Sequence, residues 1–104
     1  MTPKKGDLIW AKYQSTKGNK YYLLLFLGIH KEDVYGLNAD KVPPEEIIKI
    51  RANLDIFRNG DLKEIAAWIK GNMPVAYKEG FRRYNGTKLF VINNYGLSGT
   101  KDLK

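Results

Sequence analysis

Apolar and polar positions divide the chain into a strand-rich beginning, a helical middle and a strand-rich end. Residues 8–13 and 33–37 are short apolar segments, and residues 21–29 form the longest apolar run. A continuous apolar run is typical of a strand covered on both faces, so we expect residues 21–29 to be the central strand. The polar, glycine-containing residues 14–20 are expected to form a loop. Together these segments predict an antiparallel meander.

The first helix signal is the sequence PPEE at residues 43–46. A proline suits the first helical turn, where its missing N–H is not needed, and the carboxylates favour the positive end of the helix dipole. Ile47, Ile50 and Leu54 follow at helical spacing. The pattern predicts a helix over about 44–54.

A second helix signal begins at Asp61. Asp61 and Glu64 have the spacing of a capping box, and Gly71 stands where a glycine often ends a helix. One apolar stripe lies between these positions: Leu62, Ile65, Ala66 and Ile69. The pattern predicts a helix over 61–70.

The last third of the chain has the pattern of a β-hairpin. Residues 75–84 and 88–95 flank the dipeptide Asn85-Gly86, and Asn-Gly favours a two-residue type I′ turn because both central residues of that turn need a positive φ. In this register Arg83 lies opposite Lys88. Residues from about 98 to 104 are predicted to be a flexible tail.

The order β-β-β-α-α-β-β predicts an α+β fold, with a small, strongly bent antiparallel sheet or partial barrel and two covering helices. The 104 residues fit one domain, residues 1–104. The absence of cysteine excludes disulfides, thiolate metal sites and a cysteine nucleophile, and agrees with a cytoplasmic setting. The longest apolar run is about half of the roughly 20 residues that a membrane span needs, so no membrane contact is expected.

The sequence GDLIWAKY, residues 6–13, resembles the first strand of SH3-like barrels, in particular that of PWWP domains. It is also similar to the opening of MazF-type toxin barrels, in which a loop like STKG, residues 15–18, is common. Both resemblances imply an SH3-like sheet. They cover eight to thirteen residues of the chain.

Each resemblance implies an activity, and the next strand departs from both. PWWP domains hold methyl-lysine in an aromatic cage, to which Tyr13 and Tyr22 would contribute, but KYYL at residues 20–23 replaces the motif that names the family. MazF-type proteins cleave RNA with an Arg-Pro pair, where this chain has Lys20-Tyr21. A MazF-like ribonuclease is therefore a third alternative.

The sequence VYGLNADKVPPEEI, residues 34–47, is similar to short segments of small tailed-phage proteins. The similarity implies a phage accessory factor, which would act in the host cytoplasm by binding a host or phage protein. A protein-interaction module with an acidic protein partner is accordingly the second functional hypothesis.

Charge provides the first hypothesis. The formal net charge of +7 and the pI near 9.6 are typical of proteins that meet phosphate backbones. On the predicted hairpin, Arg83 and Lys88 repel each other by a few tenths of a kcal/mol to about 1 kcal/mol, and a bound phosphate relieves that repulsion. The alternative is a solvated hairpin tip whose charges point outward or are neutralised by Glu79.

We therefore predict a small non-enzymatic nucleic-acid-binding domain that contacts backbone phosphates with weak sequence preference and strong salt dependence. DNA and RNA fit the pattern equally, and so do single and double strands. The predicted binding residues are Lys12, Lys17, Lys20, Lys78, Phe81, Arg82, Arg83, Tyr84 and Lys88.

The remaining candidates have structural interpretations. Trp10 is expected to be a core or barrel-rim aromatic, and Trp68 a core residue that would become a protein-interface anchor if exposed. His30, the single histidine, is expected at a strand end on the surface. No P-loop, GxGxxG motif or nucleophile elbow occurs. We expect no enzyme activity, no metal site and no cofactor.

Overall fold

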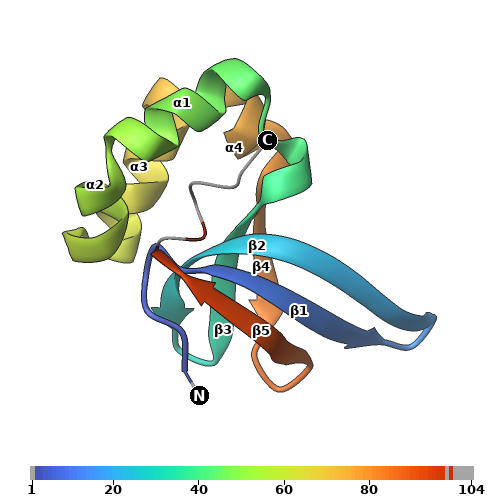
Figure 1. Ribbon diagram of the computed structural model, residues 1–104. Coiled ribbons are helices and arrows are strands. Elements are labelled where there is room, and N and C mark those ends of the chain that lie inside the picture. Colours follow the sequence, from blue (N-terminus) through green and yellow to red (C-terminus); the bar gives the residue numbers. More distant parts are fainter. Residues whose placement is uncertain (1, 98, 100–104) are drawn as a thin grey trace.

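Five antiparallel strands form one curved sheet in the computed structural model, which describes residues 2–97 and 99 (Figure 1). The strand order is β4-β3-β2-β1-β5. The strands are β1 (Leu8–Ser15), β2 (Gly18–His30), β3 (Asp33–Asn38), β4 (Phe81–Asn85) and β5 (Leu89–Gly96). The predicted α+β class is confirmed, as is the antiparallel meander at the start of the chain.

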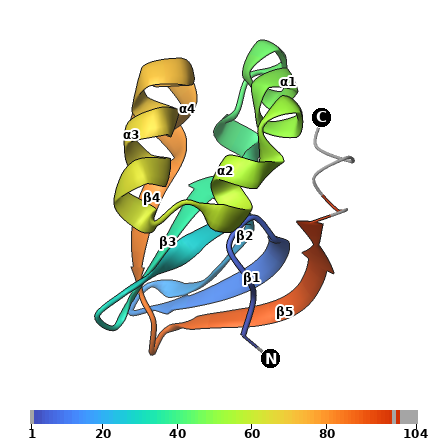
Figure 2. The same ribbon diagram turned by 90° about the vertical axis from the view of Figure 1, so that its left-hand side faces the viewer.

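Four α-helices and one short 3₁₀ helix lie between β3 and β4, all on one side of the sheet (Figure 2). They are η1 (Ala39–Lys41), α1 (Pro44–Ala52), α2 (Leu54–Asn59), α3 (Leu62–Asn72) and α4 (Pro74–Gly80). The two predicted helices correspond to α1 and α3, and the capping box between Asp61 and Glu64 is present. Gly71 does not end α3, because the helix continues to Asn72 and Met73 follows as its cap.

The strand predicted over residues 75–80 is wrong, because this segment is helix α4. Pro74 starts the helix, and the buried carboxylate of Glu46 in α1 accepts hydrogen bonds from the amides of Ala76 (2.9 Å) and Val75 (3.4 Å). A side chain about thirty residues away therefore caps α4, and no local pattern contains that signal. Helix α2 was also absent from the expected elements.

Two apolar clusters lie on opposite faces of the sheet. On the outer face, Leu25 and Leu27 of β2 pack under the helices with Ile50, Phe57 and Ile69. The inner, concave face carries a second cluster: Ile9, Ala11, Leu24, Phe26, Val34 and Tyr84. Strand β2 is central in the sheet, as predicted, and its residues 24–27 alternate between the two clusters, so this part is covered on both faces. Tyr21 and Ile29, near the ends of the predicted segment, are exposed.

The predicted C-terminal hairpin is wrong. Strand β4 pairs with β3 and β5 pairs with β1, so the two strands lie at opposite edges of the sheet, and Arg83 lies opposite Tyr35 instead of Lys88. Neither Asn85 nor Gly86 has the positive φ of a type I′ turn. Instead the Asn85 side chain accepts hydrogen bonds from the amide and hydroxyl of Thr87.

Gly86 is needed for another reason: its amide donates to the Glu32 carbonyl at 3.0 Å, and a Cβ here would lie 2.3 Å from that oxygen. The turn thus carries the chain from one sheet edge to the other.

The loop predicted over residues 14–20 is shorter than expected. Ser15 pairs with Gly18, so β1 and β2 form a hairpin with only Thr16 and Lys17 between them. Of the predicted flexible tail, residues 98 and 100–104 lie outside the described residues. No helix in the described part of the chain is long and apolar enough to cross a membrane.

Candidate nucleic-acid interface

The helices cover only part of the outer face of the sheet, and the β1–β2 hairpin extends beyond them (Figure 1). Leu8 and Leu25 lie under the helical layer. Further along the same strands, the outer face carries Trp10, Lys12 and Tyr21, and the neighbouring β5 adds Phe90. We call these four residues the aromatic–lysine patch.

Pairing in the sheet brings the four side chains together. Lys12 lies directly opposite Tyr21 on one side and Phe90 on the other, so three adjacent strands each place one side chain in a single row. The Lys12 ammonium lies 5.5 Å from the centre of the Phe90 ring, within the range of a cation–π contact. The Trp10 ring stacks beside Tyr21, with centroids 6.0 Å apart and an interplanar angle of 20°.

The patch is accessible to solvent. Tyr21 is 52% exposed and Phe90 is 45% exposed, whereas Trp10 and Lys12 are partly buried. Large exposed rings beside a lysine on a sheet provide the two contacts that nucleic acid needs, a stacking surface for bases and a cation for phosphate.

Acidic residues are absent from the strands that form the patch. Strands β1, β2, β4 and β5 contain no Asp or Glu, and nine of the eleven acidic residues lie within residues 32–79, together with seven of the eighteen basic ones. Residues 32–79, which form β3 and the helices, therefore carry a formal charge of −2. Residues 8–31 and 80–97, which contain the other four strands, have seven basic residues and no acidic one, so the strand layer carries a concentration of positive charge.

Three further lysines lie near the patch. Lys17 and Lys20 are exposed at the end of the β1–β2 hairpin. The Gln14 amide donates to the Lys88 carbonyl at 2.9 Å, and strand alternation then places the Lys88 side chain on the same side as Phe90. Within residues 2–97 and 99, neither these three lysines nor Lys12 form an ion pair.

Two predicted stacking residues pack against other aromatic rings of the protein. Phe81 stacks on Tyr77 with ring centroids 5.1 Å apart and joins the outer core. Tyr84 is 6% exposed and lies between Tyr13 and Tyr22, with ring centroids 5.4 and 5.5 Å away. Burial raises the pKa of Tyr84 to about 12, and Tyr22 adds to the rise. Tyr84 therefore offers no free face for a base, and one face of the partly buried Phe81 ring is occupied by Tyr77.

The predicted arginines do not share a surface with Lys88. Arg82 and Arg83 point to opposite faces of β4, as neighbours on a strand must. The Arg83 Nε lies 3.8 Å from a carboxylate oxygen of Asp33, and both side chains are exposed.

The other predicted candidates lie outside the patch. Lys78 lies on helix α4, and Trp68 packs edge-on against the buried Phe57. His30 is exposed at the end of β2, as predicted.

Tyr21 and Phe90 are the binding candidates that the sequence-based assignment missed. The acid-free stretch from residue 8 to residue 31 was a usable signal, because it marks a long hairpin without internal neutralisation. The exposure of the two rings was not predictable from the sequence, because it depends on how much of the outer face of the sheet the helices cover.

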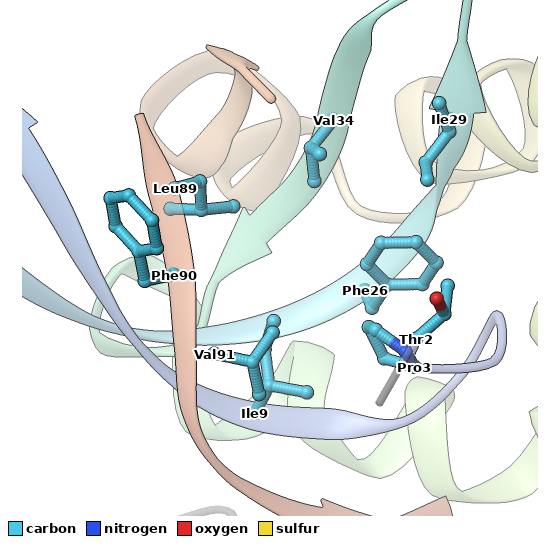
Figure 3. Close-up of a pocket in the computed structure, with 9 residues that line it drawn as sticks. All are labelled: Thr2, Pro3, Ile9, Phe26, Ile29, Val34, Leu89, Phe90 and Val91. Carbon is cyan, nitrogen blue, oxygen red and sulfur yellow. The ribbon is translucent and has the colours of Figure 1, made fainter. Parts of the chain in front are cut away.

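An apolar groove of about 290 Å³ lies on the inner side of the sheet, between β5 and the turn that joins β2 to β3 (Figure 3). Leu89 and Val91 point toward it, whereas Phe90 projects from the other side of β5 (Figure 3). Ile29 and Val34 line the opposite wall. Phe90 nevertheless borders the groove, so the groove and the aromatic–lysine patch meet at this residue.

The described residues contain no group of three or more His, Cys, Asp or Glu side chains that could hold a metal ion. Comparison of the chain with protein-family models, with curated proteins and with solved structures gives no match. The geometry and charge of the patch are therefore the features that bear on function.

Proposed function

We propose that this protein is a small non-enzymatic nucleic-acid-binding domain that contacts backbone phosphates with weak sequence preference. The observation that carries the proposal is the aromatic–lysine patch, which lies on the acid-free part of the sheet with Lys17, Lys20 and Lys88 nearby. We also propose an SH3-like partial barrel, on the basis of the bent five-stranded sheet and its strand order.

Phosphate is the expected target because no carboxylate of the described residues pairs with Lys12, Lys17, Lys20 or Lys88. An ammonium group without a neighbouring carboxylate gains by replacing the counterions of a phosphate backbone, and that gain falls as salt rises. Because lysine is a point charge that does not read base edges, affinity should vary little with sequence.

Fluorescence anisotropy with labelled oligonucleotides tests the proposal at two salt concentrations. Replacing Lys12 and Lys88 with alanine should weaken binding and reduce the slope of log affinity against log salt by about 0.7–0.9 for each phosphate that the variant no longer neutralises. The matched control replaces Lys41 and Lys63, two exposed lysines of the helical layer, and removes the same charge.

The control variant should bind like the wild type. Equal effects of the two double variants would show that only net charge matters, and no binding at low salt would refute the proposed function.

A protein-interaction module is the second candidate, favoured by the apolar groove beside β5. Ile29 is 53% exposed and Val91 is 37% exposed at its walls. Strand β5 lies at the edge of the sheet, and two register shifts in its pairing with β1 make it irregular, which disfavours addition of a further strand. A partner would therefore insert apolar side chains into the groove. Loss of a salt-resistant, nuclease-resistant complex in an Ile29→Ser/Val91→Ser variant would support this candidate.

A further inference from the structure

We infer that the ligand of the aromatic–lysine patch is a single strand that crosses β2, β1 and β5 in an extended form, with one base on Tyr21, another on Phe90 and a phosphate at Lys12. This inference rests on the proposed function and names the form of nucleic acid that the patch selects.

The exposed rings distinguish single strands from duplexes. A base inside a duplex has both faces covered by its neighbours, so an aromatic side chain on a protein surface can stack only on an unpaired base. Tyr21 and Phe90 are the rings of the patch with about half of their surface free. A duplex could still touch the lysines, but it would gain nothing from the rings.

The spacing of the row requires an extended strand. Tyr21, Lys12 and Phe90 lie opposite one another on three adjacent strands, and neighbouring strands are about 4.8 Å apart. The two aromatic residues are thus separated by about 10 Å at the backbone. Successive bases in a helical stack are only about 3.4 Å apart. Bases on the two rings must therefore be unstacked from each other, with the connecting backbone over Lys12.

Trp10 and Lys12 prepare the two stacking positions differently. The nearly parallel Trp10 ring supports Tyr21 from one side and limits its rotation. On the other side, the Lys12 ammonium lies over the Phe90 ring and must move aside when a base arrives. An exposed cation–π contact is weaker than base stacking, and the released ammonium gains a phosphate, so the exchange favours binding.

The test compares a short oligothymidine single strand with a duplex of the same length at low salt, using anisotropy. Tyr21→Ala and Phe90→Ala should each weaken single-strand binding by about 5- to 150-fold and leave duplex binding unchanged. Tyr21→Phe, which keeps the ring, should restore single-strand affinity. Ile48→Ala removes an exposed apolar side chain from α1 and is the matched control, for which no change is expected.

Trp10 fluorescence gives a second readout, which would not change if Tyr21 and Phe90 had only a structural role. In a Trp68→Phe background, the single strand should quench Trp10 through the base on Tyr21, and the duplex should not. Equal affinities for both forms together with unaffected alanine variants would overturn this inference and leave the proposed function standing. Absence of binding to either form at low salt would overturn both.

Discussion

The helical layer and the uncovered part of the sheet use charge in opposite ways. In the helical layer, Asp61 caps α3, Glu46 caps α4, and Asp7 holds Arg58 of α2 at 2.8 Å. Each of these carboxylates satisfies groups within the protein. The β1–β2 hairpin and β5 contain no carboxylate, and Lys12, the central cation of the patch, contacts an aromatic ring.

The two regions also differ in how they use aromatic rings. Phe57 of α2 is fully buried, with Trp68 packed edge-on against it, whereas Phe90 lies half exposed on β5. Burial of Phe57 stabilises the fold, and exposure of Phe90 leaves a ring face free for a partner. The buried rings that stabilise the fold and the exposed rings of the proposed binding surface therefore lie in separate parts of one small molecule, and substitutions should separate stability from the proposed binding.

The largest expected difference in the free energy of unfolding is between two substitutions of phenylalanine by alanine, one in each region. Phe57→Ala should lower the free energy of unfolding by about 3–5 kcal/mol, because it removes a buried ring and leaves a cavity. Phe90→Ala should lower it by less than about 1 kcal/mol, since the ring is half exposed and its cation–π contact is weak. Urea unfolding followed by circular dichroism measures both values.

Equal losses of stability in these two variants would contradict the division of roles. A large loss in Phe90→Ala would mean that β5 is part of the core and that its ring is not free to bind.

A smaller effect is expected at the link between the regions, where Asp7 accepts hydrogen bonds from Lys4, Arg58 and Asn94 of β5. Burial raises the pKa of Asp7, but these hydrogen bonds and the Arg58 charge outweigh it, so the pKa is lowered overall. Asp7→Asn should reduce the free energy of unfolding by about 1.5–3 kcal/mol at neutral pH.

The pH dependence of the Asp7 contribution has a definite sign. Because its pKa in the folded protein lies below the unfolded value of about 3.9, the carboxylate stabilises the fold above that pH, and the stabilisation disappears as pH falls through the folded-state pKa. Denaturant titrations at several pH values should therefore show a shallower acid decline in Asp7→Asn than in the wild type. Identical acid profiles would exclude the proposed ion pair.

The smallest effect concerns Tyr84 on the inner face, whose pKa is about 12. A tyrosine with a raised pKa stabilises the fold below its unfolded value of about 10, and that stabilisation is lost as pH rises toward 12. Phenolate absorbance can be read directly after a pH jump, before the protein unfolds. It should show one tyrosine that ionises at a higher pH than the others, and this step should be absent in Tyr84→Phe. Ionisation of Tyr84 near pH 10 would show that its ring is exposed and available for stacking after all.

Local signals predicted the parts of the fold that depend on local physics. Apolar continuity identified β2, and the Asp61–Glu64 capping box identified α3, because both patterns act within a few residues. Helix α4 was missed because Glu46 caps it across thirty positions. A turn does follow β4 at Gly86, but a turn does not determine whether the two strands that it connects pair with each other, and β4 pairs with β3 instead of β5.

The binding residues divide in the same way. Lys12, Lys17, Lys20 and Lys88 were predicted from charge alone, and the structure leaves them without ion pairs in the part of the chain that it describes. Phe81 and Tyr84 looked like stacking residues in the sequence, but Phe81 packs on Tyr77 of helix α4 and Tyr84 is buried in the inner cluster. Tertiary packing decides which aromatic of a strand is free, and a single sequence does not contain that information.

On the proposed division, the strand layer binds nucleic acid and the helical layer supports the strands. Titration of isotopically labelled protein with a short single-stranded oligonucleotide, followed by amide chemical shifts, would locate the binding surface residue by residue. We expect the largest shifts on β1, β2 and β5 around Lys12, Tyr21 and Phe90, with α1 to α4 nearly unchanged. Shifts centred on the helices, or none at low salt, would contradict the account.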